Sequence, residues 1–124
     1  MRVIKKSEIT NELITPQGEI IYELIGKSEL TGGTIKHSLA HVVIPLGKSC
    51  VLHFHQVSEE TYYILKGEGW MRIDQEEFSL QPGKACLIEP GEKHQIFNRG
   101  KTDLEFLAIC APAWVPEDSF EVRE

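Results

Sequence analysis

The sequence contains no cluster of lysine and arginine residues and no long apolar run. Acidic and basic residues are mixed along its 124 residues, and the formal net charge is −6. Because a nucleic-acid-binding surface needs a basic patch, DNA or RNA binding is not expected. No apolar stretch approaches the roughly 18 residues of a membrane-spanning helix, and no apolar segment of a signal peptide follows residues 1–6. These absences favour a soluble, cytoplasmic protein that contacts no membrane.

Cysteine is scarce. The three cysteines, Cys50, Cys86 and Cys110, are an odd number, and no two of them are closely spaced. Each has apolar neighbours, as expected for a small buried side chain in a reducing compartment. The cysteines therefore predict neither a disulfide framework nor a catalytic thiol.

Helical periodicity is also absent from most of the chain. Ten glycines and six prolines interrupt it at short intervals, and the segments between them are rich in strand-forming residues. This pattern predicts an all-β domain, either a sandwich or a barrel. The predicted strands are residues 20–26, 37–45, 51–55, 61–66, 70–74, 77–80, 85–88, 95–98 and 104–110.

No linker or internal repeat divides the chain, so residues 1–124 are predicted to form one domain. Residues 1–26 would supply an N-terminal strand or an arm that reaches a neighbouring subunit, and residues 112–124 a C-terminal tail. The open sheet edges of such a small barrel need cover. We therefore expect a homodimer whose interface includes the N-terminal strand and an outward-facing apolar residue of segment 37–43.

The main chemical signal is His53-Phe54-His55, followed by Glu60. Residues two apart in a strand point the same way, so both imidazoles face one side. A carboxylate at the start of the next antiparallel strand can close on the same point. Imidazole and carboxylate ligands suit a divalent transition metal ion such as Mn, Fe, Ni or Zn. A His-x-His pair by itself is weak evidence, because such pairs also arise by chance on exposed strands.

Two longer segments resemble the two motifs of the cupin superfamily. The first segment reads Gly47-(x5)-His53-x-His55-(x4)-Glu60-(x6)-Gly67. The second segment reads Gly83-(x5)-Glu89-Pro90-Gly91-(x2)-His94-(x3)-Asn98. It departs from the motif at one position, because the motif proline falls on Glu89 and Pro90 stands beside it.

The resemblance implies a cupin jelly-roll β-barrel, or double-stranded β-helix, with a motif core at residues 47–98. It also implies that His94 joins His53, His55 and Glu60 as the fourth ligand of one divalent metal ion. The chain looks most similar to small single-domain bacterial cupins of the mannose-6-phosphate isomerase-like group. The residues themselves agree, since the Pro90-Gly91 turn can bring His94 back into the barrel.

Strand alternation predicts which side chains surround the metal. If Glu60 points inward, Tyr62 and Ile64 do so as well, and Ile96 follows His94. The predicted apolar wall consists of Val42, Val51, Ile64 and Ile96.

Three residues need a choice between two interpretations. His37 and His41 lie on the mixed face of their strand and are expected to point outward, away from the metal. Tyr62 is the candidate catalytic residue, because a phenol beside a metal can hydrogen-bond a substrate or donate a proton. It is equally well interpreted as a wall aromatic whose hydroxyl bonds to the backbone.

The ligand set indicates which molecules could bind. Three imidazoles and one carboxylate leave about two positions free on an octahedral ion, and the site stays positive, which favours an oxyanion. Only Lys93 and Arg99 are candidates for holding a phosphate. We expect a metal-dependent enzyme on a small oxygenated substrate, either a sugar-type isomerase or a dioxygenase. The alternative is a non-catalytic, metal-dependent binding module for a sugar or a small acid.

Overall fold

Antiparallel strand pairing organises most of the chain in the computed structural model, which describes residues 1–124. The larger sheet has six strands in the order β1-β2-β3-β10-β5-β8. Its strands are β1 Leu13–Ile14, β2 Ile20–Ile25, β3 Ser38–Ile44, β5 Glu59–Lys66, β8 Ala85–Ile88 and β10 Leu104–Ala111. Because β10 pairs with both β3 and β5, the last long strand joins the N-terminal strands to the middle of the chain.

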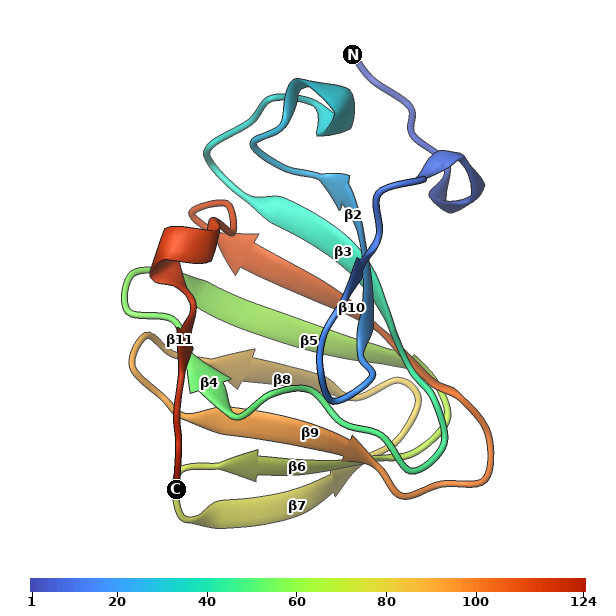
Figure 1. Ribbon diagram of the computed structural model, residues 1–124, viewed down its shortest axis with the longest axis vertical. Coiled ribbons are helices and arrows are strands. Elements are labelled where there is room, and N and C mark those ends of the chain that lie inside the picture. The colour runs from blue at the N-terminus through green and yellow to red at the C-terminus, as the bar shows by residue number, and fades with distance from the viewer.

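The second sheet has five strands in the order β11-β4-β9-β6-β7. Its strands are β4 His53–Phe54, β6 Gly69–Ile73, β7 Glu76–Leu80, β9 His94–Asn98 and β11 Phe120–Glu121. Three short 3₁₀ helices complete the chain: η1 Lys6–Glu8, η2 Glu29–Thr31 and η3 Pro116–Asp118. Figure 1 shows β5, β9 and β10 running across the molecule, with the N-terminus at one end of its long axis and the C-terminus toward the other. The prediction of an all-β domain is confirmed, and none of the helices has the length and apolar character needed to cross a membrane.

The hydrophobic core lies where the inner faces of the two sheets meet. Alternate residues of each strand point into it, as the period of two requires. Its largest fully buried side chains are Val42, Ile44, Ile64, Met71, Ile88, Ile96, Leu104 and Phe106. Gly67 lets the β5–β6 turn pass close to β10, because it has φ +85° and a Cβ there would lie 2.6 Å from the carbonyl oxygen of Asp103.

Two chain segments differ from the sequence-based expectation. The predicted strand at residues 51–55 is reduced to β4, because β9 pairs with it at one position and β11 at two. The N-terminal segment does not differ, because it supplies the edge strand β1, which pairs with β2 and was one of its two expected roles. Residues 112–124 were expected to form a tail, but they contain η3 and β11, and β11 extends the second sheet beside β4.

The outer face of the larger sheet carries exposed apolar side chains over neighbouring strands. Tyr63 and Leu65 of β5, Leu87 of β8 and Ile109 of β10 are each 37–56% exposed. Ile109 lies opposite Leu39 of β3, which is in the segment expected to reach the interface. Soluble domains rarely leave a contiguous apolar patch uncovered. We therefore propose that this face, together with edge strand β1, pairs with a second copy of the chain.

Replacing Ile109 with lysine should convert the proposed dimer to a monomer at micromolar concentration, because the ammonium group would be desolvated in an apolar interface. Light scattering coupled to size exclusion gives the mass. Val57→Lys is the matched control, since Val57 is also exposed but lies in the turn between β4 and β5. A wild-type protein of monomer mass would contradict the proposed dimer.

Candidate metal centre

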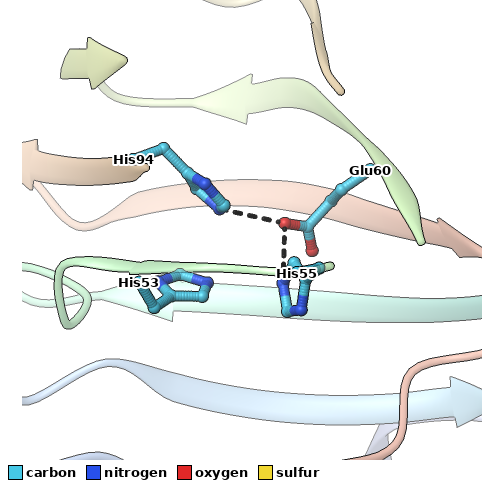
Figure 2. Close-up of side chains that lie close together, drawn as sticks. All are labelled: His53, His55, Glu60 and His94. Carbon is cyan, nitrogen blue, oxygen red and sulfur yellow. Dashed lines mark hydrogen bonds and ion pairs between the residues drawn. The ribbon is translucent and has the colours of Figure 1, made fainter. Parts of the chain in front are cut away.

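The four predicted ligands come from both sheets and meet at one point. His53 begins β4 and His94 begins β9, and the two are cross-strand partners. His55 is two residues beyond His53 and shares its face, while Glu60 reaches across from β5. One ligand atom from each residue lies within 4.8 Å of all the others. Figure 2 shows the side chains converging, and we call these four residues the His₃Glu cluster.

Each histidine of the cluster is oriented by a backbone carbonyl. The Nδ1 atoms of His53, His55 and His94 lie 2.6, 2.9 and 2.9 Å from the carbonyl oxygens of Val51, Asp118 and Glu92. A carbonyl only accepts a hydrogen bond, so each Nδ1 carries the ring proton. In the neutral rings the three Nε2 lone pairs are therefore free, as a metal ligand requires.

The carboxylate of Glu60 is held among these rings. Its Oε1 lies 3.2 Å from Nε2 of His94 and 3.4 Å from Nε2 of His55, as the dashed lines in Figure 2 mark. The thiol of Cys110 donates to its other oxygen at 3.2 Å. Burial alone would raise the pKa of Glu60, but the neighbouring His55 and His94 rings hold it well below its ordinary range. Glu60 thus stays ionised.

A cation would stabilise the arrangement of lone pairs and negative charge in the cluster. Three imidazole nitrogens and a carboxylate oxygen face one another, and Glu60 and His94 are 6% and 0% exposed. His55 Nε2 is buried without a hydrogen-bond partner. Lone pairs that converge away from water repel one another unless a proton or a metal ion lies between them. The residues present therefore fit a divalent metal ion, and the cluster could hold one.

The C-terminal segment fixes the position of His55, which sequence reasoning did not foresee. The Asp118 carboxylate, on η3, accepts hydrogen bonds at 3.0 Å from the backbone N–H groups of Gln56, Val57 and Ser58. Burial would raise the pKa of Asp118, but these three donors hold it below its ordinary value. A single Asp in a predicted tail carries no spacing signal, so only the fold reveals this role.

Replacing Asp118 with alanine should lower the free energy of unfolding by about 2–4 kcal/mol, because three backbone donors lose a charged acceptor. The same change should weaken metal binding, since His55 loses its orienting loop. Urea unfolding of the metal-free protein and a metal titration measure the two effects. Asp103→Ala is the control, because Asp103 is exposed, and equal stability of the two variants would contradict the assignment.

A cavity of about 320 Å³ opens from the cluster. Val42, Val51 and Tyr62 line it, as predicted, but Ile64 and Ile96 do not. These two residues are 1% and 0% exposed and belong to the core. Ile64 lies two residues beyond Tyr62 on β5, and Ile96 lies two residues beyond His94 on β9, so both are past the end of the cavity. The predicted apolar wall is thus only half correct.

The alternative histidines point away from the cavity. His37 is exposed, and Nε2 of His41 lies 2.8 Å from Oε1 of Glu105. Neither residue belongs to the cluster or lines the cavity. The prediction that both face outward is confirmed.

Tyr62 lies in the cavity wall, with its ring edge-on to the His94 ring at 6.1 Å between centroids. Burial, followed by the charge of Glu60, raises the pKa of the phenol well above its ordinary value. Tyr62 therefore stays protonated and can donate a hydrogen bond, but it cannot act as a base near neutral pH. Its catalytic role remains a prediction.

Another part of the wall comes from the N-terminal hairpin, for which sequence reasoning predicted no role in the site. The hairpin residues that line the cavity are Asn11, Leu13, Thr15, Glu19, Ile21 and Glu23. All are odd-numbered, as expected for one face of a β-ribbon. No lysine or arginine lines the cavity, and the two candidates for holding a phosphate, Lys93 and Arg99, are exposed outside it. A bound metal ion would therefore supply the main positive charge.

Comparisons with known proteins agree with this fold. A family model described as the cupin domain matches residues 40–110. An uncharacterized protein of Methanocaldococcus jannaschii is 38% identical over 120 residues, which are 96% of this chain and 94% of that protein. An oxalate-binding protein of Thermotoga maritima is 37% identical over 112 residues, 86% of this chain and 91% of that protein. The crystal structure of a predicted oxalate decarboxylase from Thermotoga maritima has a TM-score of 0.75 at 33% identity and covers 90% of this chain and 99% of that one.

Proposed function

This chain belongs to the cupin family and shares its double-stranded β-helix fold, and we propose that it binds a small chelating acid, such as oxalate, through a divalent metal ion. The ion would be held by the His₃Glu cluster, with Mn, Fe, Ni and Zn as the candidates. The observation that carries the proposal is the convergence of three free Nε2 lone pairs and one buried carboxylate on a single point. The ion would supply Lewis acidity and open positions for ligand oxygens.

The charges around the cavity support an acid as the ligand. One carboxylate beside a divalent ion leaves the centre with a net positive charge, which attracts an anion. The outer wall carries carboxyl groups and apolar side chains but no cation. An anion small enough to sit directly on the metal fits this distribution. A phosphorylated sugar fits it poorly, because its phosphate would lie away from the metal without a basic partner.

The similarity to the oxalate-binding protein of Thermotoga maritima supports the same ligand class. Oxalate has two adjacent carboxylates that can chelate one ion through two oxygens, matching the two positions left on an octahedral ion by four protein ligands. Other acids with two neighbouring oxygen donors, such as 2-oxo acids, share this chemistry. The proposal therefore concerns a class, for which oxalate is the first test molecule.

Oxygen-dependent catalysis is a second candidate. Tyr62 places a protonated phenol in the same cavity as the cluster, and a hydrogen-bond donor beside a metal-bound acid is a common catalytic element. Oxygen uptake or loss of oxalate by the iron- or manganese-loaded protein, diminished in Tyr62→Phe, would support a dioxygenase or a related enzyme. Binding of oxalate without turnover would support the binding module.

The binding test uses the intact protein loaded with Mn²⁺ or Zn²⁺. Isothermal titration with oxalate should show one site per chain, and the chelator-treated protein should show none. Inorganic phosphate and glucose serve as comparison ligands and should bind far more weakly. Absence of oxalate binding to the metal-loaded protein at millimolar concentration would overturn the proposal.

A further inference from the structure

Two polar side chains in the N-terminal hairpin face the cavity without a partner in the protein. The side chain of Glu19 lines the cavity, the residue is 7% exposed, and no hydrogen bond contributes to its pKa. The hydroxyl of Thr15 is buried and has no hydrogen-bond partner. Buried polar groups are nearly always satisfied, so two unpartnered groups on one wall need an explanation.

The hairpin fixes the two groups side by side. Leu13 pairs with Ile21 and Ile14 with Ile20, so the same register places Thr15 opposite Glu19. The backbone N–H of Thr15 donates to the carbonyl of Glu19 at 2.9 Å. Cross-strand partners point to the same face of a ribbon, which here is the cavity face. The pair is therefore held on the cavity wall by the backbone.

The turn that closes this hairpin is itself constrained. Gly18 has φ +104°, and its N–H donates to the carbonyl of Thr15 at 3.0 Å. A Cβ on Gly18 would lie 2.9 Å from the side chain of Lys48. Only glycine fits comfortably here, so the position of the Thr15–Glu19 pair is built into the local sequence.

We propose that Glu19 and Thr15 form a second polar subsite of the cavity, which hydrogen-bonds the end of the bound acid that points away from the metal. This inference rests on the proposed function. A ligand such as oxalate has carboxylate oxygens that remain free when others bind the ion. Glu19, as a neutral acid, and Thr15 would donate to those oxygens. The subsite would thereby select acids with oxygens at both ends over acids with an apolar end.

The surroundings of Glu19 favour the neutral, donating form. Burial, and after it the charge of Glu60, raises the pKa of Glu19 to about 8, while the charge of His55 opposes the rise. The other titratable groups around it are Tyr62 on β5, Cys50 before β4 and Glu23 on β2, the strand that follows Glu19. Joint binding of a divalent ion and a doubly charged acid adds no net charge to the centre. In the complex, the charge of the ion and the charge of the acid therefore cancel, and Glu60 remains as the charge that acts on Glu19.

Two substitutions at Glu19 separate hydrogen bonding from mere packing. Glu19→Ala removes the donor and should lower oxalate affinity of the metal-loaded protein by about tenfold at pH 7, the effect of one lost hydrogen bond to a charged group. Glu19→Gln keeps a donor and should stay within about threefold of wild type. Thr15→Val, which removes only the hydroxyl, should weaken binding in the same direction as Glu19→Ala.

A pH series gives a readout that a purely structural role would not change. Wild-type affinity for oxalate should fall between pH 7 and pH 9 as Glu19 ionises, and Glu19→Gln should lack that fall. Glu12→Gln, which lies in the same N-terminal segment but is exposed and outside the cavity, is the control and should behave as wild type. Metal content measured by elemental analysis should be equal in all these proteins, because neither residue belongs to the cluster.

The outcomes distinguish this inference from the proposed function. Wild-type affinity in Glu19→Ala would overturn the subsite alone, as would an affinity in Glu19→Gln as low as in Glu19→Ala. Failure of the metal-loaded wild-type protein to bind oxalate would overturn the proposed function and the subsite with it.

Discussion

Replacing His94 with alanine is expected to remove nearly all bound metal. His94 is fully buried, its Nδ1 is oriented by the carbonyl of Glu92, and its Nε2 faces Glu60. Substituting the partners that merely orient metal ligands typically costs 10- to 100-fold in affinity, so loss of a ligand should cost more than about 100-fold. Elemental analysis of the purified protein should fall from about one ion per chain to background.

Elemental analysis can also compare the histidines of the cluster with the two histidines outside it. His53→Ala should lose metal as His94→Ala does, because each contributes one of the converging nitrogens. His37→Ala and His41→Ala should keep full metal content, since the first is exposed and the second pairs with Glu105 outside the cavity. Full occupancy in both cluster variants would show that the ion is held elsewhere.

The cluster was predictable from sequence because its four residues lie in two short motifs with fixed spacing. His53 and His55 share a strand face by the period of two, and the motif spacing links them to Glu60 and His94. The same periodicity placed Tyr62 correctly in the cavity wall. It misplaced Ile64 and Ile96, because alternation says which face a residue occupies but not how far along the strand the cavity extends.

The residues that sequence reasoning missed depend on long-range packing. Asp118 meets the loop at Gln56 only after η3 folds back across about sixty residues of chain. Glu19 reaches the cavity because β2 pairs with β3 and thereby joins the wall beside the cluster. No spacing links either residue to the motifs. Their contribution therefore follows from sheet order, which the sequence pattern does not contain.

Acidification should release the metal gradually, because the pKa of His55 is raised and that of His53 is lowered. Protons compete with metal ions for imidazole nitrogens, so affinity falls as pH falls through each pKa. Three histidines with the ordinary pKa of about 6.5 would lose the ion steeply below roughly pH 6. Burial alone would lower the pKa of His55, but Glu60 and the carbonyl of Asp118 raise it above that value. Competition at His55 therefore begins at a higher pH than at an ordinary imidazole.

His53 extends the transition at its acidic end. Burial, followed by the proximity of His94, lowers the pKa of His53 to about 4, and Glu60 stays ionised throughout this range. Metal affinity, measured by competition with a chelator from pH 8 to pH 4, should thus begin to decline at a higher pH than for ordinary imidazoles and should continue to fall down to about pH 4. Asp118→Ala keeps that backbone carbonyl but removes the carboxylate charge that helps to raise the pKa of His55, so the onset of the decline should shift to lower pH. A flat affinity from pH 8 to pH 4.5 would show that imidazoles are not the principal ligands, and a single steep loss at pH 6 would show that the three rings titrate as equals.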